Sequence, residues 1–129
     1  MKYTTKVIGD KGEDYAAAYL EKHGCKILER NYRTRYGEID IIAQKKDTTL
    51  FVEVKTRQNN PLERPFKAVD YRKQQRILRT AMTYIRERQL DGNYRCDICE
   101  VYVDRNTLEL LRINYYENAF VPGNGYGYG

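Results

Sequence analysis

The sequence lacks tryptophan and contains only one histidine and three cysteines among its 129 residues. Cys25, Cys96 and Cys99 cannot all pair with one another, so we expect reduced thiols. A single Cys-x-x-Cys pair, with His23 as the only nitrogen ligand, argues against a structural zinc site. The sequence contains no Ser-His-Asp set and no phosphate loop. The sequence therefore argues against a disulfide-stabilised protein, a structural zinc protein and an enzyme with a serine nucleophile.

Long apolar runs are missing as well. No run approaches the roughly 20 residues that a membrane-spanning helix needs. The first residues, MKYTTKVIGDKGED, lack the apolar stretch of a secretory signal. We therefore expect a cytoplasmic protein that makes no contact with a membrane.

The length and the charge of the chain indicate one basic domain. A chain of 129 residues fits a single core, which we place at residues 1–120. Residues 121–129, rich in Gly and Tyr, are predicted to be a disordered tail. Lys and Arg number 23 against 18 Asp and Glu, which gives a net charge of +5 and permits a polyanionic partner such as nucleic acid.

Apolar spacing predicts two helices and five strands. The first helix spans 10–23, beginning at a capping box of Asp10 and Glu13, and the second runs from Phe66 to Leu90. The predicted strands cover residues 26–32, 37–44, 49–56, 95–104 and 107–116. The segment 57–65 reads as a loop that could act as a lid. The order α-β-β-β-α-β-β predicts an α/β fold with a mixed central sheet flanked by helices.

Alternation along these strands predicts which side chains share a face. In 37–44 it places Ile39, Ile41 and Ala43 together. In 49–56 it places Phe51, Glu53 and Lys55 on one face, opposite Leu50, Val52 and Val54. Because Cys96 and Cys99 are an odd number of residues apart, they are expected on opposite faces.

One group of charged residues could carry chemistry. Asp40 precedes Glu53 across a predicted hairpin, and Lys55 shares the strand face of Glu53. Carboxylates that pack together raise each other's pKa, so a divalent cation or a basic neighbour normally accompanies them. Mg²⁺ suits one or two carboxylates with phosphate oxygens, and a nearby lysine can orient or deprotonate water, as in phosphodiester hydrolysis. The alternative is a solvated strand face with a weak cross-strand ion pair between Asp40 and Lys55.

Four segments, GEDYAAAYLEKHGCKILERNYR, GEIDIIA, FVEVKTR and AVDYRKQQRI, closely resemble the YraN-like family of small bacterial proteins over residues 9–103. That family looks like a branch of the PD-(D/E)XK nuclease superfamily, with a restriction-endonuclease-like fold and kinship to archaeal Holliday junction resolvases. The resemblance implies that Glu13, Asp40, Glu53 and Lys55 are catalytic. It also implies that Asp40 and Glu53 hold Mg²⁺ or Mn²⁺, and that Glu53-Val54-Lys55 is the E-x-K element. Ile39 stands where the superfamily often has proline.

Basic residues near this group are candidates for phosphate contact. The predicted nucleic-acid-binding residues are Arg30, Arg33, Arg35, Arg57 and Lys73. Alternatively, Lys73 could lie at the border of an apolar stripe and extend its ammonium group into solvent. Glu13 could likewise serve only to complete the capping box with Asp10. The remaining arginines of the second helix, Arg72, Arg76 and Arg79, read as a solvated basic face, useful at most for non-specific backbone contact.

Three hypotheses follow from the sequence. The first is a Mg²⁺-dependent endonuclease that acts on DNA, branched DNA included. The second is a nucleic-acid-binding module that keeps the nuclease fold without turnover, and the third is a structural interaction protein. A junction resolvase would act as a homodimer, for which Leu110, Tyr115 and Tyr116 are the expected anchors.

Overall fold

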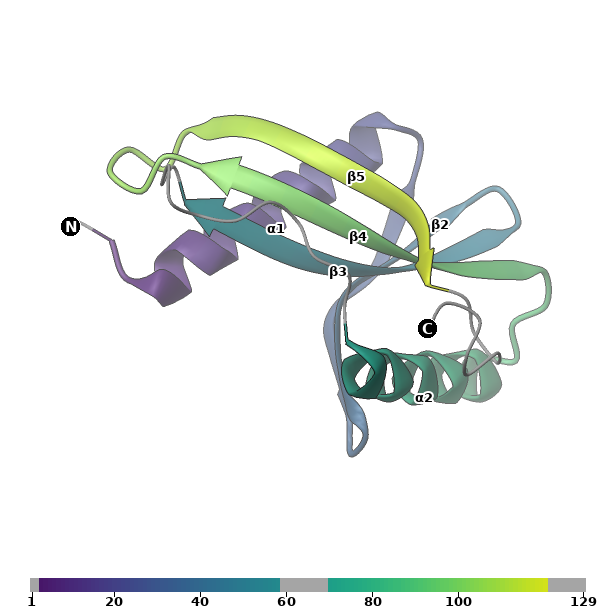
Figure 1. Ribbon diagram of the computed structural model, residues 1–129. Helices are drawn as coiled ribbons and strands as arrows, with labels where there is room; N and C mark the ends of the chain where they lie inside the picture. The colour runs from purple at the N-terminus through teal and green to yellow at the C-terminus, as the bar shows by residue number, and fades with distance from the viewer. Residues whose placement is uncertain (1–2, 59–69, 121–129) are drawn as a thin grey trace.

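The computed structural model describes residues 3–58 and 70–120 and has the predicted order of elements (Figure 1). The elements are α1 (Thr5–Lys22), β1 (Lys26–Thr34), β2 (Gly37–Lys45), β3 (Thr48–Gln58), α2 (Tyr71–Arg88), β4 (Asn93–Val103) and β5 (Leu110–Phe120). The five strands form one sheet in the order β1-β2-β3-β4-β5. β3 and β4 are parallel, and the other neighbours are antiparallel. The predicted α/β architecture with a mixed sheet is therefore confirmed.

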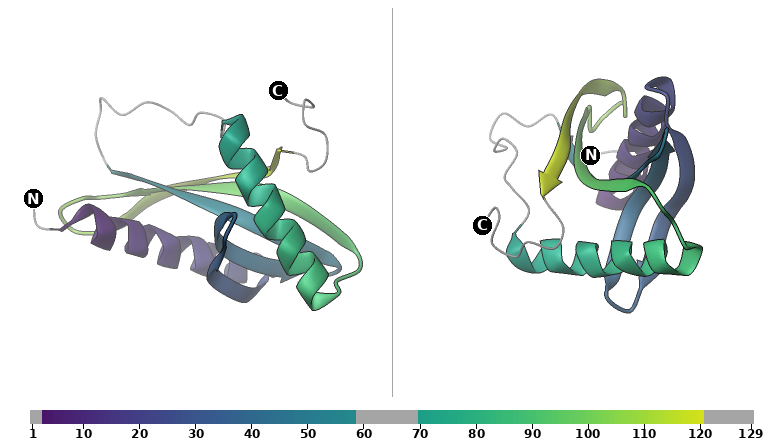
Figure 2. Two further views of the ribbon diagram at one scale, coloured as in Figure 1. Left: turned by 90° about the horizontal axis from the view of Figure 1, so that it is seen from below. Right: turned by 90° about the vertical axis from the view of Figure 1, so that its right-hand side faces the viewer.

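The two helices cover opposite faces of the sheet (Figures 1 and 2). On one face, Ala16 and Leu20 of α1 pack in a cluster with Cys99. On the other face, Ile77 of α2 packs in a second cluster with Cys96. The two cysteines thus lie on opposite faces, as alternation predicts, and both are free thiols.

The start of α1 differs from the prediction. The helix begins at Thr5, and the hydroxyl of Thr4 caps it by accepting a hydrogen bond from the Val7 N–H. Asp10 lies within the helix and forms an ion pair with Lys6. The capping box of Asp10 and Glu13 is therefore wrong, because a capping hydroxyl six residues earlier starts the helix sooner. Glu13 therefore does not serve as a capping residue, which was the alternative to a role in the candidate site.

Other boundaries shift by a few residues. Asp70 caps α2 by accepting from the Lys73 N–H, so the helix starts at Tyr71, later than predicted. Arg57 and Gln58 belong to β3, so the predicted loop of 57–65 is wrong at its start. The rest of that loop and its proposed role as a lid, the segment 66–69 and the predicted tail of 121–129 lie outside the described residues.

The last strand begins later than predicted. Asp104 accepts hydrogen bonds from the N–H groups of Asn106 and Thr107, and this turn delays β5 to Leu110. Within β5, the Tyr115 ring packs against the cluster under α1. Tyr116 packs against the cluster under α2, so two of the three expected dimer anchors contact this chain's own core. Within the described ranges, no helix is long and apolar enough to cross a membrane.

One irregularity in β2 positions the candidate site. Ile41 and Ala43 belong to the cluster under α1, whereas Ile39 belongs to the cluster under α2. The prediction that these three side chains share a face is therefore wrong for Ile39. Pairing between β2 and β3 extends only to Ile41 and Val52, although β1 and β2 stay paired to the end of their hairpin. The hairpin of β1 and β2 thus parts from β3 on the N-terminal side of Ile41, and the alternation changes there.

Candidate active site

Asp40 and Glu53 lie at the point where β2 parts from β3. The last pair of that ladder joins Ile41 to Val52, so Asp40 and Glu53 are the next residues on the two strands. The Val54 N–H of β3 donates its hydrogen bond to the Asp40 side chain and not to a backbone carbonyl of β2. The distance from the Val54 nitrogen to Asp40 Oδ2 is 2.8 Å. The two acids predicted to come together across the hairpin are therefore neighbours.

Both carboxylates line one cavity. Its volume is about 190 Å³, and its lining residues are Gly37, Glu38, Asp40, Glu53, Lys73, Arg76 and Ile77. Glu53 is buried, with 8% of its surface exposed, and shares the α2-facing side of β3 with Phe51. Asp40 is partly exposed, so the carboxylate pair is reachable by solvent.

The electrostatic state of Asp40 is unusual. Its pKa is raised from 3.8 to about 7, first by burial and then by the negative charge of Glu53. The hydrogen bond from the Val54 N–H acts in the opposite direction, and Glu13 adds a smaller rise. In the described part of the chain, no cation contacts Asp40 directly. Asp40 therefore lies beside a second carboxylate without a direct cationic partner of its own among the described residues.

Two lysines converge on Glu53. Lys73 of α2 lies 2.5 Å from Glu53 Oε2, and Lys55 of β3 lies 3.8 Å from the same oxygen. Burial and the charge of Lys73 lower the pKa of Lys55. Burial also acts to lower the pKa of Lys73, but its hydrogen bond and ion pair with Glu53 outweigh that effect and raise it. Lys55 is therefore the lysine that gives up its proton more readily.

Glu13 reaches the site from the opposite face. Gly12 lies so close to β3 that a Cβ atom there would overlap the Thr56 side chain, so only glycine permits this approach. The next residue, Glu13, accepts hydrogen bonds from Arg30 Nη2 at 3.2 Å and from Asn31 Nδ2 at 3.0 Å. Its charge raises the pKa of Asp40. Glu13 thus belongs electrostatically to the site, held in place by β1.

The other buried acids of the domain provide a contrast. Asp97 accepts hydrogen bonds from the Arg95 guanidinium, the Tyr115 hydroxyl and the Asn118 N–H. Arg95 and Asp97 also form an ion pair, with Nε 2.9 Å from Oδ1.

Glu100, which is also buried, accepts from Arg57 Nε at 3.2 Å and from Asn114 Nδ2 at 3.1 Å. A buried carboxylate with a full set of donors is explained by the fold alone. Asp40 faces a second carboxylate instead, so its position calls for a ligand.

The donor set fits a small hard cation better than a softer one. The described residues contain no group of three or more His, Cys, Asp or Glu side chains able to hold a metal ion. An all-protein cage for zinc or calcium therefore has no counterpart in them. Mg²⁺ commonly keeps several waters and uses one or two carboxylates together with substrate phosphates. Asp40 and Glu53 would be the protein ligands of such an ion.

The predicted phosphate-binding residues have different surroundings. Arg30 pairs with Glu13 and Asp14, and Arg57 pairs with Glu100, so both position acidic side chains. Arg33 is exposed beside Glu38, at 3.3 Å. Lys73 lies in the site cavity, and Arg35 lines a separate hollow beside α2.

Two residues that line these hollows were not predicted to do so: the sequence pattern places Arg76 on a solvated basic face and does not identify Tyr36. Arg76 borders the site cavity, and Tyr36 projects from the turn between β1 and β2 onto α2. The recurrence of arginine every three or four residues along α2 is a signal that could have identified this face of the helix.

The comparisons with known proteins agree with one another. A family model described as "Uncharacterised protein family UPF0102" matches residues 12–101. The chain is 44% identical over 120 residues to the UPF0102 protein TTE1452 of Caldanaerobacter subterraneus subsp. tengcongensis. It is 45% identical over 118 residues to a UPF0102 protein of Alkaliphilus oremlandii. These matches cover 92% and 89% of this chain, and 98% of each relative.

A solved structure is also similar in outline. SfsA of Pyrococcus furiosus, in complex with Ca²⁺, matches with a TM-score of 0.41 and 15% sequence identity. The match covers 88% of this chain and 63% of that chain. The family match and the curated relatives confirm the resemblance to the YraN-like proteins, and the chain belongs to the UPF0102 family.

Proposed function

We propose that this protein is a metal-dependent nuclease that hydrolyses phosphodiester bonds of DNA. The observation that carries the proposal is the buried pair of Asp40 and Glu53, in which Asp40 faces a carboxylate and has its pKa raised to about 7. A divalent cation would relieve this repulsion, and it would supply Lewis-acid activation of the phosphate and of a bound water. The resemblance to the PD-(D/E)XK superfamily points to the same residues.

Different residues of the chain have different roles in the proposed hydrolysis. Water adds across one P–O bond, so its oxygen bonds to phosphorus, one proton leaves it, and the departing oxygen gains a proton. Lys55, whose pKa is lowered, is placed to orient the water and take up its proton. Lys73 lies in the same cavity, where its ammonium group can hold a phosphate oxygen. Glu13 positions the water or the metal from the α1 side.

A second candidate function rests on one contact. Because the Lys73 ammonium already neutralises Glu53, the fold could persist without a metal ion and bind nucleic acid without cleaving it. This is the non-catalytic binding module. Cleavage in the presence of metal separates it from the nuclease.

The test is cleavage of supercoiled plasmid by the purified full-length chain in Mg²⁺, in Mn²⁺ and in EDTA. Asp40→Asn removes one proposed ligand, and Asp91→Asn, at an exposed position away from the site, is the matched control. We expect the wild type and the Asp91 variant to cleave in either metal, and the Asp40 variant to be inactive. Cleavage that survives in EDTA or in the Asp40 variant would refute the proposed site. Metal-independent binding without any cleavage would establish the second candidate instead.

A further inference from the structure

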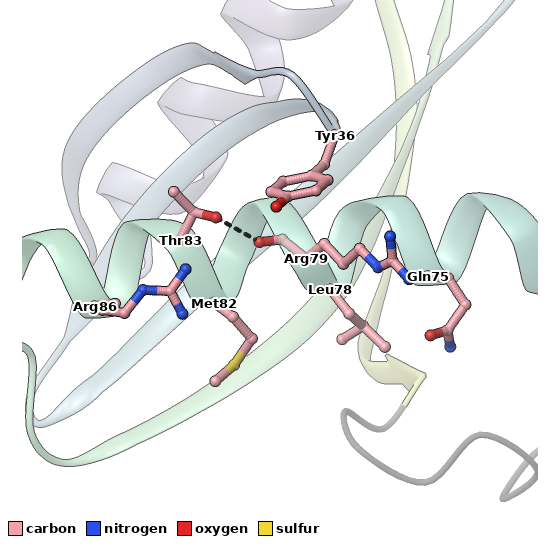
Figure 3. Close-up of a pocket in the computed structure, with 7 residues that line it drawn as sticks. All are labelled: Tyr36, Gln75, Leu78, Arg79, Met82, Thr83 and Arg86. Atoms are coloured by element: carbon pink, nitrogen blue, oxygen red, sulfur yellow. Dashed lines mark hydrogen bonds between the residues drawn. The ribbon is translucent and has the colours of Figure 1, made fainter.

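The outward side of α2 contains a groove that the proposed chemistry does not use. Two hollows of about 370 and 400 Å³ lie along this helix and share Tyr36, Gln75 and Arg79. The first extends to Met82 and Arg86, as Figure 3 shows, and the second extends toward the start of the helix. Because they share these residues, they form one continuous groove, here called the α2 groove. Its remaining lining residues are Arg35, Tyr71, Arg72, Arg76, Leu78 and Thr83.

The charge of the α2 groove has one sign. Arginines at positions 35, 72, 76, 79 and 86 line it, and none of the described residues in the lining is acidic. In the described part of the chain, Arg72, Arg76, Arg79 and Arg86 form no ion pair with a carboxylate. Like charges three or four residues apart on a helix repel one another. An extended row of unpaired arginines is therefore suited to a polyanion that neutralises them.

The spacing of the row fits a nucleic-acid strand. Arg72, Arg76, Arg79 and Arg86 recur at the intervals that keep side chains on one side of a helix. From the first to the last, a rise of 1.5 Å per residue gives about 21 Å along the helix axis. At the axial spacing of about 3.4 Å per phosphate that one strand has in B-form DNA, this length corresponds to about six stacked nucleotides, and to fewer nucleotides of an extended strand.

Aromatic and apolar groups are interleaved with the arginines. Tyr36, in the turn between β1 and β2, lies over α2 (Figure 3). The guanidinium group of Arg35 lies 5.1 Å from the centre of the Tyr36 ring, and that of Arg79 lies 5.8 Å from it. Tyr71 and Met82, both in the lining, are 51% and 40% exposed. Contact with phosphates alone needs no exposed apolar surface, whereas unpaired bases stack on aromatic rings and guanidinium planes. This mixture of groups favours a strand with unpaired bases over a closed duplex.

The α2 groove adjoins the site cavity. Arg76 lines both the groove and the cavity that holds Asp40 and Glu53. Gly37, directly after Tyr36, borders the cavity as well. A strand that follows the groove would therefore bring a phosphate to the carboxylates. The hydrogen bond from Arg35 to the Tyr36 hydroxyl, and the charges of Arg35, Arg79 and Arg86, lower the pKa of that tyrosine, in keeping with a strongly positive surface.

We propose that the α2 groove binds a single-stranded or unpaired segment of nucleic acid, with phosphates on the arginine row and one base stacked on Tyr36. This inference rests on the proposed function, since it names the form of substrate that the nuclease would take. It predicts a preference for flaps, bubbles or branched junctions, in which unpaired nucleotides are available, over closed duplex DNA.

The experiment measures binding without cleavage. Fluorescence anisotropy in EDTA follows the full-length protein on a short labelled single-stranded oligonucleotide and on the matching closed duplex. Tyr36→Ala is expected to weaken single-strand binding by about 5- to 100-fold and duplex binding much less, whereas Tyr36→Phe keeps the ring and the affinity. Arg79→Ala is expected to reduce the slope of log affinity against log salt by about 0.7.

Matched controls lie outside the groove. Arg105→Ala removes the same charge at the far β4–β5 turn, and Tyr94→Ala removes an exposed tyrosine at the start of β4. The proposal that the α2 groove binds unpaired nucleic acid is wrong if the control variants lower affinity as much as the groove variants. It is also wrong if Tyr36→Ala weakens binding to the duplex and to the single strand equally. Plasmid cleavage by the same protein samples tests the nuclease separately. If the groove variants lose binding but the wild type does not cleave plasmid, the α2 groove is supported as a binding site and the nuclease proposal is rejected. If the wild type cleaves plasmid but the groove variants bind normally, the nuclease proposal is supported and the α2 groove is rejected as a binding site.

Discussion

Replacing Asp40 by asparagine isolates the charge of this side chain. Asparagine has the same shape, and its amide oxygen can still accept the hydrogen bond that the Val54 N–H donates to Asp40. Its amide NH₂ can donate to the Glu53 carboxylate, with which Asp40 already interacts. Because the contacts are retained, any change in stability reports the cost of the negative charge. We expect Asp40→Asn to make the metal-free protein more stable at high pH.

The size of the effect follows from the pKa. In the folded protein the pKa of Asp40 is about 7, against an ordinary value of 3.8 for the unfolded chain, and burial is the main cause. At 1.36 kcal/mol for each pH unit, the difference corresponds to about 4 kcal/mol. Because the folded pKa is the higher one, the stability contribution of protonated Asp40 is full below pH 3.8 and is lost as the pH rises through about 7.

The assay is urea unfolding followed by circular dichroism in EDTA, at about pH 5 and about pH 8. The advantage of Asp40→Asn over the wild type should grow by about 3 kcal/mol between these two conditions. The exposed control Asp91→Asn should stay within about 0.5 kcal/mol of the wild type at both. Added Mg²⁺ should stabilise the wild type at the higher pH and leave Asp40→Asn unchanged. An advantage that does not depend on pH, or a loss of stability at high pH, would show that Asp40 is not a destabilising buried charge.

Four further predictions concern other parts of the molecule. Lys55→Ala should abolish metal-dependent plasmid cleavage while anisotropy detects nearly unchanged DNA affinity, and unaltered cleavage would reduce Lys55 to an ordinary lysine. Gly12→Ala should lower the free energy of unfolding by about 1–3 kcal/mol in urea, with partial recovery when Thr56→Ala removes the nearest overlapping atoms. Tyr115→Phe should cost about 1–3 kcal/mol without altering cleavage, because its hydroxyl donates to a buried aspartate on β4, and equal stability would contradict that role. Sedimentation velocity should detect a homodimer that Leu110→Glu, at an exposed position on the edge strand β5, converts to monomer; a monomeric wild type with and without a four-way junction would exclude the dimer.

Local patterns in the sequence were enough to predict the order of the elements. The alternation that puts Phe51 and Glu53 on one face of β3 has a period of two residues, which a short segment reveals by itself. The odd separation of Cys96 and Cys99 likewise places them in different clusters. These predictions hold because each depends only on the geometry of a single strand.

Features that depend on packing between elements were not predicted. Ile39 changes face because the β1–β2 hairpin parts from β3, and the sequence of β2 contains no signal for that separation. Two capping signals compete near the first helix, and the hydroxyl of Thr4 prevails over Asp10. Lys73 was identified as a phosphate-contact candidate, but its ion pair with Glu53 depends on how α2 crosses the sheet. Tyr36 was missed for the same reason, since its turn meets α2 only in three dimensions.

The separation of β2 from β3 explains why the site lies where it does. α1 and α2 lie on opposite faces, so side chains from both layers can act on one carboxylate pair only where the sheet between them is open. At this opening Glu13 of α1 acts on Asp40, while Lys73 of α2 contacts Glu53. The opening also leaves the Val54 N–H without a β2 carbonyl, and Asp40 accepts that hydrogen bond in its place. The bond that ends the ladder therefore also holds the half-buried Asp40 beside Glu53, so the same feature of the fold that opens the sheet assembles the charged site.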